Sequence, residues 1–390
     1  MKVNFDFLQE IQWAEIPPFL YAIFGVFALS ALIQLGYYWG PFRKVAYMRP
    51  KKNPDSRQPV SVVICAKNER QNLEKNLPLF LEQDYPEFEV IVVNDCSTDE
   101  TEALLYKLKS EYKKLQVTTI EQDRKFAHDR KLAITVGIKA ARYDHIIFSE
   151  PDCAPGSKWL GAMQQAFGDK GELVVSYCRS KRRSGLADKI IRADAVTSAL
   201  CSLRGAMVGK PYRCTIKNMG LRQSMFFRGK GFANYNSFPS SEETLFLCRN
   251  GSAGNTQVTL HRDAIVSSLQ GLTFGQWFKQ KSLYLSLLGM GKRGVGRIRF
   301  EMFSRLLFYA SLAALAALSV IDEDFLPLIG AAPLVLTRLI SRMVIARKML
   351  RKLQEKGLFF WLLVYDYASP LLAFVIAMAQ PNLQKIKKFK

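Results

Sequence analysis

The longest charge-free stretch of the chain places a strong limit on its fold. Residues 16–42 contain no charged side chain and are long enough to cross a bilayer as a helix. We expect a retained membrane helix over residues 18–39, because the basic start and the small-residue cleavage site of a signal peptide are missing. The basic residues that follow predict that the next segment is cytoplasmic and that residues 1–17 are not. These residues are Arg43, Lys44, Arg49, Lys51 and Lys52.

Further apolar stretches follow near the other end of the chain, at residues 306–321, 325–337 and 358–379. We predict two or three membrane helices within residues 301–380. The second stretch spans only if Arg338 and Arg342 reach the cytoplasmic face. Three spans would put the basic tail, residues 381–390, on the outer side, against the usual excess of Lys and Arg in cytoplasmic segments. Because Pro370 interrupts the last stretch, a re-entrant hairpin there is the alternative.

Between the apolar ends, residues 55–272 alternate between strand-like and helix-like patterns. Continuous apolar runs such as 60–66 and 88–93 are typical of strands buried on both faces of a parallel sheet. With further strands at 116–120 and 145–148 and helical spacing between them, the order is βαβαβαβ. This order predicts an α/β fold with a mostly parallel, Rossmann-like sheet. A helix over 159–167, a strand over 172–177 and a last strand over 258–268 are expected to follow.

The charge of the chain restricts its partners. There are 55 Lys and Arg against 34 Asp and Glu, a formal charge of +21. Residues 179–230 hold many of these basic groups and indicate a membrane-facing surface or an acceptor site. Residues 273–300 combine aromatic, apolar and basic side chains, which predicts an interfacial amphipathic segment. A nucleic-acid binder would not need flanking membrane helices, so we expect no nucleic-acid partner.

The cysteine and histidine content argues against a disulfide framework and a zinc site. The seven cysteines are odd in number, lie in the central part of the chain and form no Cys-x-x-Cys pair. We expect them to be buried, reduced thiols of a cytosolic domain. With three histidines in the chain, a His-based metal site is also not expected.

Acidic side chains directly follow two of the predicted strands. Glu150 and Asp152 flank Pro151, and Asp95 ends an earlier strand. Ligands of open α/β sheets bind past the carboxyl ends of the strands, and two carboxylates there can hold a hard divalent cation that binds phosphate. The structural alternatives are a solvated acidic turn for the first pair and a helix-capping turn for Asp95.

Charged groups also lie at the starts of two predicted helices. Glu242 and Glu243 open one of them, where acidic residues either act chemically or complement the helix dipole. Lys131 begins the other, as a phosphate contact or as an exposed helix lysine.

The upstream motifs resemble the opening of the family 2 glycosyltransferases, which have the GT-A fold. Residues 59–69 (PVSVVICAKNE) and 89–99 (EVIVVNDCSTD) are similar to the first two strand ends of that family, over which a nucleotide sugar lies. Glu150-Pro-Asp152 stands where the family has an Asp-x-Asp motif at the end of the fourth strand, and residues 131–137 resemble the preceding helix.

Two downstream motifs extend the resemblance, which covers about residues 59–285. Residues 218–224 resemble the acceptor-side segment, and Glu242-Glu243 the paired acidic motif that holds the catalytic base. The resemblance therefore implies that Glu243, or else Glu242, takes the proton of the acceptor hydroxyl. It also implies a Mg²⁺ or Mn²⁺ ion held by Asp152 and Glu150. The remaining implied contacts are Ala66, Lys67, Asn68, Glu69, Asn94, Asp95, Lys131 and Glu150 for the nucleotide sugar, and Asn218, Gln280 and Lys281 on the acceptor side.

The implied function is an inverting transfer from a UDP- or GDP-sugar to a lipid-linked or membrane-proximal glycan acceptor. The enzyme would be an integral protein of a bacterial inner membrane with a cytoplasmic catalytic domain, and membrane lipids would be partners. Residues 280–284 match the family's Gln-x-x-Arg-Trp motif only at the Gln, which favours a single transfer over processive polysaccharide synthesis. Glu150 and Glu243 replace Asp of the family pattern. A catalytically silent member that binds sugar nucleotide or scaffolds a membrane complex is the second alternative.

Overall fold

The computed structural model divides the chain into two compact units. The first comprises residues 1–41 and 297–345, and the second residues 42–296 and 346–390. The structure describes residues 17–49, 57–121, 130–211, 215–232, 246–247, 249–290 and 295–378.

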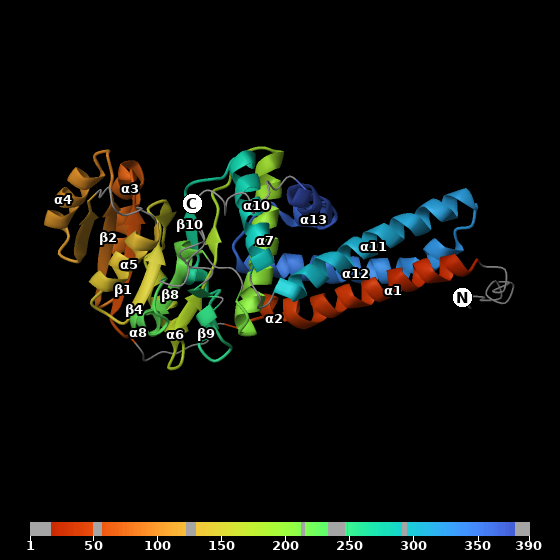
Figure 1. The fold of residues 1–390 in the computed structure, drawn as a ribbon, viewed down its shortest axis with the longest axis horizontal. Helices are drawn as coiled ribbons and strands as arrows, with labels where there is room; N and C mark the ends of the chain where they lie inside the picture. Colours follow the sequence, from red (N-terminus) through yellow and green to blue (C-terminus); the bar gives the residue numbers. More distant parts are fainter. Residues whose placement is uncertain are drawn as a thin grey trace. The chain divides into compact units, whose positions relative to one another are not determined.

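A mixed seven-stranded sheet forms the centre of the second unit, in the order β3-β2-β1-β4-β8-β6-β9 (Figure 1). Its first half is parallel and confirms the βαβαβαβ order expected from the sequence. The parallel strands are β1 (Val60–Ala66), β2 (Phe88–Asp95), β3 (Leu115–Ile120) and β4 (His145–Ser149). The expected α/β class with a mostly parallel, Rossmann-like sheet is therefore confirmed.

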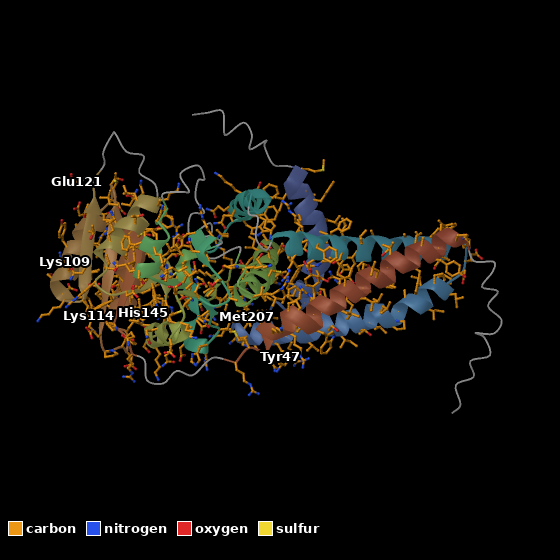
Figure 2. All side chains as sticks on the ribbon, turned by 60° about the horizontal axis from the view of Figure 1, so that its bottom comes forward. Tyr47, Lys109, Lys114, Glu121, His145 and Met207 are labelled. Carbon is orange, nitrogen blue, oxygen red and sulfur yellow. The ribbon has the colours of Figure 1, made fainter. Side chains whose placement is uncertain are left out.

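Helices cover both faces of the parallel strands. The face with Val62 and Val90 packs in one apolar core against α3 (Arg70–Leu81), α4 (Thr101–Glu111) and α6 (Trp159–Phe167). The opposite face receives α5 (Arg130–Ala140). Its approach is close, since a Cβ on Gly137 would come within 2.4 Å of a Val63 methyl group. Lys109, Lys114 and Glu121 are exposed on the outer side of α4 and β3 (Figure 2).

The second half of the sheet is built from shorter strands. β8 (Met219–Arg222) runs antiparallel to β4 and to β6 (Leu173–Val175), and β9 (Thr256–Val258) closes the edge. A small sheet pairs β10 (Val266–Ser268) with β5 (Cys153–Ala154) and β7 (Cys178–Arg179). Through its pairing with β5, β10 lies next to the segment that directly follows β4.

The prediction of one strand over residues 258–268 was wrong. The chain leaves the large sheet after Val258, makes a 3-10 turn at Arg262–Ala264 and joins the small sheet as β10. In that turn the His261 Nδ1 accepts a hydrogen bond from the Asp263 N–H. The short strand-forming stretches on either side of His261-Arg-Asp263 do not reveal by themselves that they pair with different sheets.

Longer helices complete the second unit. α7 (Leu186–Met207) contacts α13 (Phe359–Met378), and α10 (Phe274–Met290) contacts both. α8 (Gln223–Arg228) follows β8, and α2 (Arg43–Ala46) packs on α7. The buried Asp194 carboxylate of α7 accepts hydrogen bonds from Trp277 Nε1 at 2.9 Å and Tyr365 OH at 2.6 Å, which ties the three long helices together.

The first unit contains α1 (Pro18–Tyr37), most of α11 (Val295–Ile321) and most of α12 (Leu326–Lys352). Phe27, Phe308 and Leu315 lie in its apolar core. Arg338 is 4% exposed, with its guanidinium over the Phe308 ring. Arg342 is also buried. The stretch before them was expected to span a membrane only if both arginines reached the cytoplasmic face. Both instead lie inside the helical packing, where aromatic faces attract the charge of Arg338.

Four described helices are long and apolar enough to span a membrane. They cover residues Pro18–Ala46, Arg299–Ile321, Leu326–Lys352 and Phe359–Ile376.

Candidate active site

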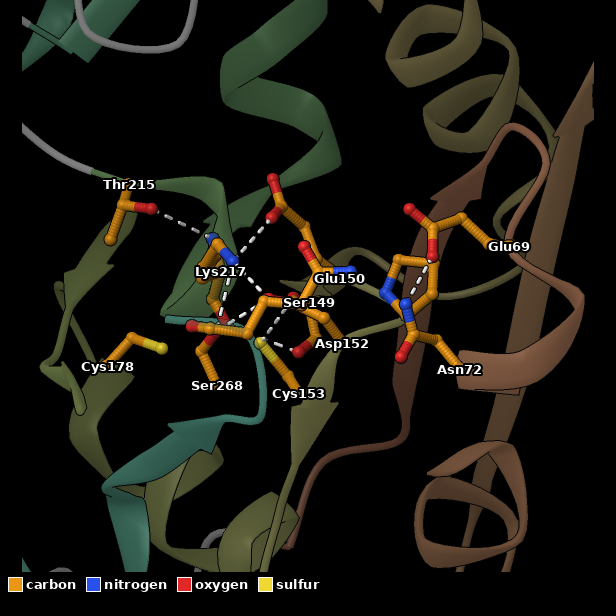
Figure 3. Close-up of polar contacts among 12 residues, drawn as sticks. Glu69, Asn72, Ser149, Glu150, Asp152, Cys153, Cys178, Thr215, Lys217 and Ser268 are labelled. Atoms are coloured by element: carbon orange, nitrogen blue, oxygen red, sulfur yellow. Dashed lines mark hydrogen bonds and ion pairs between the residues drawn. The ribbon is translucent and has the colours of Figure 1, made fainter. Parts of the chain in front are cut away.

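The carboxylates of Glu150 and Asp152 lie in a tight turn that follows β4 directly (Figure 3). The Cys153 N–H donates to the Glu150 carbonyl at 3.0 Å and closes the turn. The buried amide of Asn76 in α3 donates to the Pro151 carbonyl at 2.8 Å. With proline restricting the backbone as well, the turn presents both acidic side chains in a fixed position.

Lys217 lies between these two carboxylates. Its Nζ is 2.5 Å from Asp152 Oδ2 and 3.1 Å from Glu150 Oε2. The other Glu150 oxygen pairs with Arg130, and the Ser268 hydroxyl donates to Asp152 Oδ2 at 2.5 Å. Lys217, Arg130 and Ser268 were not predicted from the sequence, because nothing in their local pattern marks them and the fold alone brings them to this turn.

The cluster is partly shielded from water, which strengthens its electrostatics. Asp152 is 4% exposed, whereas Glu150 and Lys217 keep a partly open side. Burial alone would lower the pKa of Lys217, but the Glu150 and Asp152 carboxylates outweigh it and raise that pKa above its usual range. The lysine is therefore a permanent cation at neutral pH.

A network of buried hydrogen bonds fixes the backbone of Lys217. The Ser149 hydroxyl donates to the Lys217 carbonyl at 3.1 Å. The next residue, Asn218, is fully buried and donates to the carbonyls of Tyr177 and Ala264, both at 2.8 Å. Its Oδ1 accepts from Trp159 Nε1 at 3.1 Å. Asn218 was expected to contact the acceptor. In the structure its side chain holds the backbone next to Lys217 through these hydrogen bonds.

The ends of β1 and β2 form a second polar edge. Ala66 pairs with Asn94 in the parallel register, so the predicted nucleotide-sugar residues of both strands lie side by side. Asn68 Oδ1 accepts the Thr98 N–H at 2.8 Å, and the Glu69 N–H donates to Thr101 Oγ1 at 3.0 Å. These bonds join the two loops that follow the strands. Lys67 is exposed at the same edge.

Two side-chain oxygens at this edge have no hydrogen-bond partner among the described residues. They are Asn94 Oδ1 and Asp95 Oδ1, on side chains that are 1% and 9% exposed. Buried polar atoms normally have partners, so these oxygens can accept hydrogen bonds from a bound molecule.

The remaining predicted residues lie in different places. Lys131 is half-buried in the first turn of α5, next to Arg130. Gln280 is exposed on α10, whereas Lys281 Nζ is 2.5 Å from the buried Asp194 carboxylate. Glu242 and Glu243 lie outside the residues that the structure describes.

The donor atoms at the turn are chemically suited to a divalent cation, with a restriction. Mg²⁺ and Mn²⁺ prefer carboxylate oxygens and complete their shells with phosphate and water. Glu150 and Asp152 supply two such side chains, and among the described residues no group of three or more His, Cys, Asp or Glu could hold an ion alone. The Lys217 ammonium already pairs with both carboxylates, so an ion held by the same two side chains would compete with it.

The thiols near the turn are unreactive. Cys153 is buried, and its pKa is raised by the adjacent Cys178 thiol and by burial. Burial raises the pKa of Cys65 in β1 to about 12. The five described cysteines are all free, but of these only Cys153 is buried, so the expectation that they are buried was wrong for the other four.

The sequence matches a family model over this region of the fold. Residues 61–226, which contain the parallel strands, the turn and Lys217, match the model described as glycosyl transferase family 2.

Curated relatives match over a shorter segment. The poly-β-1,6-N-acetyl-D-glucosamine synthase of Staphylococcus aureus (strain COL) is 30% identical over 113 residues, which is 28% of this chain and 26% of that protein. The synthase of Staphylococcus epidermidis is 27% identical over 112 residues, 29% of this chain and 26% of that protein. The match thus spans about a quarter of the length of these relatives.

A solved structure shares the fold over most of the chain. The mannosyltransferase of Pyrobaculum calidifontis, in complex with GDP-Man and Mn²⁺, superposes with a TM-score of 0.60 at 18% sequence identity. The superposition covers 92% of this chain and 99% of that one. It supports a GT-A fold here.

Proposed function

We propose that this chain is an inverting, membrane-anchored glycosyltransferase, because residues 61–226 match the model of glycosyl transferase family 2. It would move a sugar from a nucleotide-diphosphate donor to a lipid-linked or membrane-proximal glycan. The observation that carries this proposal is the fixed Glu150-Asp152 pair with Lys217 between its carboxylates, next to the polar edge of β1 and β2.

The polar edge supports a role in donor binding. Asn94 and Asp95 offer buried oxygens that can accept hydrogen bonds from the nucleobase or the ribose. The neighbouring loop residues Lys67, Asn68 and Glu69 would line the same donor, and Lys131 would contact its phosphates. Since the two loops are joined by hydrogen bonds, the edge is already ordered before a donor arrives.

The turn after β4 supports a role in leaving-group stabilisation. Glu150 and Asp152 would hold a Mg²⁺ or Mn²⁺ ion, which when bound neutralises charge on the diphosphate. Lys217 would leave the carboxylates as the donor binds, and its ammonium would then contact a phosphate oxygen.

The acceptor side requires a base opposite the leaving group. Glu243, or Glu242 in its place, would accept the proton of the attacking hydroxyl. Gln280 on α10 is exposed and is our candidate for an acceptor contact, whereas Lys281 would hold α10 in place through Asp194. Asn218 would act indirectly by fixing Lys217.

The setting of the reaction follows from the apolar helices. Four candidate spans support an integral membrane protein, and the basic residues after α1 favour a cytoplasmic catalytic domain. The synthase relatives are bacterial, so we assign the chain to a bacterial inner membrane with a cell-envelope glycan as its product. Only Gln280 of the Gln-x-x-Arg-Trp motif is kept, which favours a single transfer over processive synthesis.

The test is donor turnover by the purified full chain with Mn²⁺ or Mg²⁺, across a panel of UDP- and GDP-sugars. We expect hydrolysis or transfer with one donor, abolished by Asp152→Asn and by Glu243→Gln. Asp169→Asn, a change of the same kind at an exposed position, is the matched control. Activity that survives both site changes would defeat this assignment of the site.

A second candidate function is a catalytically silent protein that binds sugar nucleotide. The observation in its favour is the same Lys217 ammonium, which already fills the space between the carboxylates. This alternative predicts that a UDP- or GDP-sugar stabilises the protein against heat, without any requirement for metal and without turnover.

A further inference from the structure

A basic cavity lies in the second unit, apart from the carboxylate turn. Its volume is about 940 Å³. One wall comes from the glycosyltransferase domain and the other from the last turns of α12 and the loop that leads to α13. The basic side chains that line it are Arg179, Arg262, Arg347, Arg351, Lys352 and Lys356.

The charge of this cavity is not balanced by its own lining. Glu355 is the one carboxylate among the described residues that line it. That carboxylate is buried and already engaged, with Arg192 on one oxygen and the Tyr177 hydroxyl on the other at 3.1 Å. Six cationic side chains therefore face the cavity without a lining carboxylate left to compensate them. Such a concentration of positive charge attracts anions strongly.

The two walls are connected by hydrogen bonds, so the cavity has a defined shape. Arg179 donates through Nη2 to Ser267 Oγ at 2.6 Å and through Nη1 to the Gln354 carbonyl at 3.2 Å. Gln354 Nε2 in turn donates to the Arg262 carbonyl at 2.8 Å. Side chains held in this way lose less entropy when a ligand binds.

The position of the cavity in the chain indicates which anion can reach it. Residues 353–358 join the candidate spans Leu326–Lys352 and Phe359–Ile376, so this loop would lie at one face of a membrane that the two helices cross. Leu260, Leu350 and Phe359 add apolar lining beside the cations. A ligand here would combine an anionic group with an apolar chain, as the headgroup region of a lipid does.

We propose that this cavity binds the phosphate or diphosphate headgroup of a membrane amphiphile. Arginine forks suit phosphate oxygens, and Arg347 and Arg351 are exposed one helical turn apart on α12. The site is separate from the carboxylate turn, although the two are neighbours along β10. Ser267 bonds Arg179 of the cavity, and Ser268 bonds Asp152 of the turn. The headgroup site does not depend on the proposed transfer activity.

The experiment measures thermal stabilisation of the purified full chain by soluble probes. Farnesyl diphosphate and dihexanoylphosphatidic acid carry the proposed headgroup chemistry, the first as a prenyl diphosphate and the second as an anionic phospholipid. Farnesol and dihexanoylphosphatidylcholine are the matched probes without net negative charge, and inorganic pyrophosphate tests the free anion. All titrations contain saturating UDP and GDP, so that the nucleotide site does not contribute.

The variant is Arg347→Gln combined with Arg351→Gln. Lys107→Gln combined with Lys109→Gln, exposed on α4, removes the same charge elsewhere and is the control (Figure 2). We expect at least one anionic amphiphile to stabilise the wild type and the control. Its apparent Kd should rise about tenfold for each arginine removed. Binding of farnesyl diphosphate alone would identify a prenyl diphosphate, and binding of phosphatidic acid alone a bulk phospholipid.

Three outcomes would overturn the proposal. They are equal binding by the variant and the control, equal stabilisation by the charged and uncharged probes, and a response to pyrophosphate without one to either anionic amphiphile. Since α12 is long and both arginines are exposed at its end, the variant is expected to fold. If its thermal midpoint is lowered, Arg262→Gln, in a different element, repeats the test.

Discussion

Two strand ends of the same sheet present carboxylates in opposite states. At the end of β2, Asp95 Oδ1 has no partner among the described residues. At the end of β4, Asp152 is bonded to Lys217 and Ser268, and Glu150 to Lys217 and Arg130. The difference is that the β2 edge offers an acceptor oxygen without a partner among the described residues, whereas the carboxylates of the β4 edge are already paired with neighbouring side chains.

The largest expected effect comes from the buried member of the β4 pair. Asp152→Asn should lower kcat about a thousandfold, because it removes a preorganised charge at the leaving group. Glu150→Gln should cost about tenfold, since Glu150 is more exposed and partly neutralised by Arg130. Steady-state rates with a donor that the wild type turns over measure both. Equal losses in kcat would mean that the difference in burial does not decide how much each carboxylate contributes.

Loss of the hydrogen bonds that Asn218 makes next to Lys217 should mainly affect the stability of the fold. Asn218→Ala leaves the Trp159 donor and two carbonyls without their partner, at a cost of about 3 kcal/mol in the free energy of unfolding. Denaturant titration measures this loss. If the β4 edge is independent of the β2 edge, the Kd for nucleotide should stay within about twofold in the folded variant, and a large increase would show that the two edges are coupled.

The β2 edge should govern nucleotide affinity. Asp95→Ala removes a buried charged acceptor, so the Kd for UDP or GDP should rise about tenfold to a hundredfold. Calorimetric titration gives the Kd directly. Asp99→Ala is the comparison variant, since Asp99 caps the neighbouring loop through the Thr101 N–H instead of facing the strand end. An unchanged Kd in Asp95→Ala would remove this edge from the donor site.

The internal cation should oppose metal binding. Lys217→Met leaves both carboxylates without their shared partner, and the apparent Kd for Mn²⁺ without nucleotide should fall about tenfold. Electron paramagnetic resonance of free Mn²⁺ measures it without any activity assay. Lys139→Met, exposed on α5, is the control. Weaker or unchanged Mn²⁺ binding would show that Lys217 does not compete with the ion.

The smallest effect is a pH dependence at the opposite end of β4. Burial and then Arg222 lower the pKa of His145, whose Nε2 has no partner among the described residues. The unfolded chain therefore binds this proton more readily, and stability should fall slightly as the pH drops from 7 to 5. His145→Gln should reduce that slope in thermal melts. An unchanged slope would assign the loss to other groups, including the strand-end carboxylates.

The parallel half of the fold could be predicted from the sequence because the patterns that indicate it are local. Buried strands such as 60–66 and 88–93 carry continuous apolar runs, and the helix over Trp159–Phe167 has the predicted limits. The strand ends at Asp95 and Asp152 follow from those runs. The second half could be predicted less well. Residues 258–268 contribute to two different sheets, and which sheet each end joins depends on partners far away in the sequence.

The sequence by itself determined the α/β class, the apolar helices and the positions of the acidic strand ends, because each depends on neighbouring residues and the periods of regular structure. Only the tertiary structure brought Lys217 to Glu150 and Asp152, the second of which is 65 residues away in the sequence. It also buried Asn218 and collected basic side chains from three segments into one cavity. These pairings satisfy charge and hydrogen-bonding needs that appear only when distant segments pack, and no local pattern encodes them.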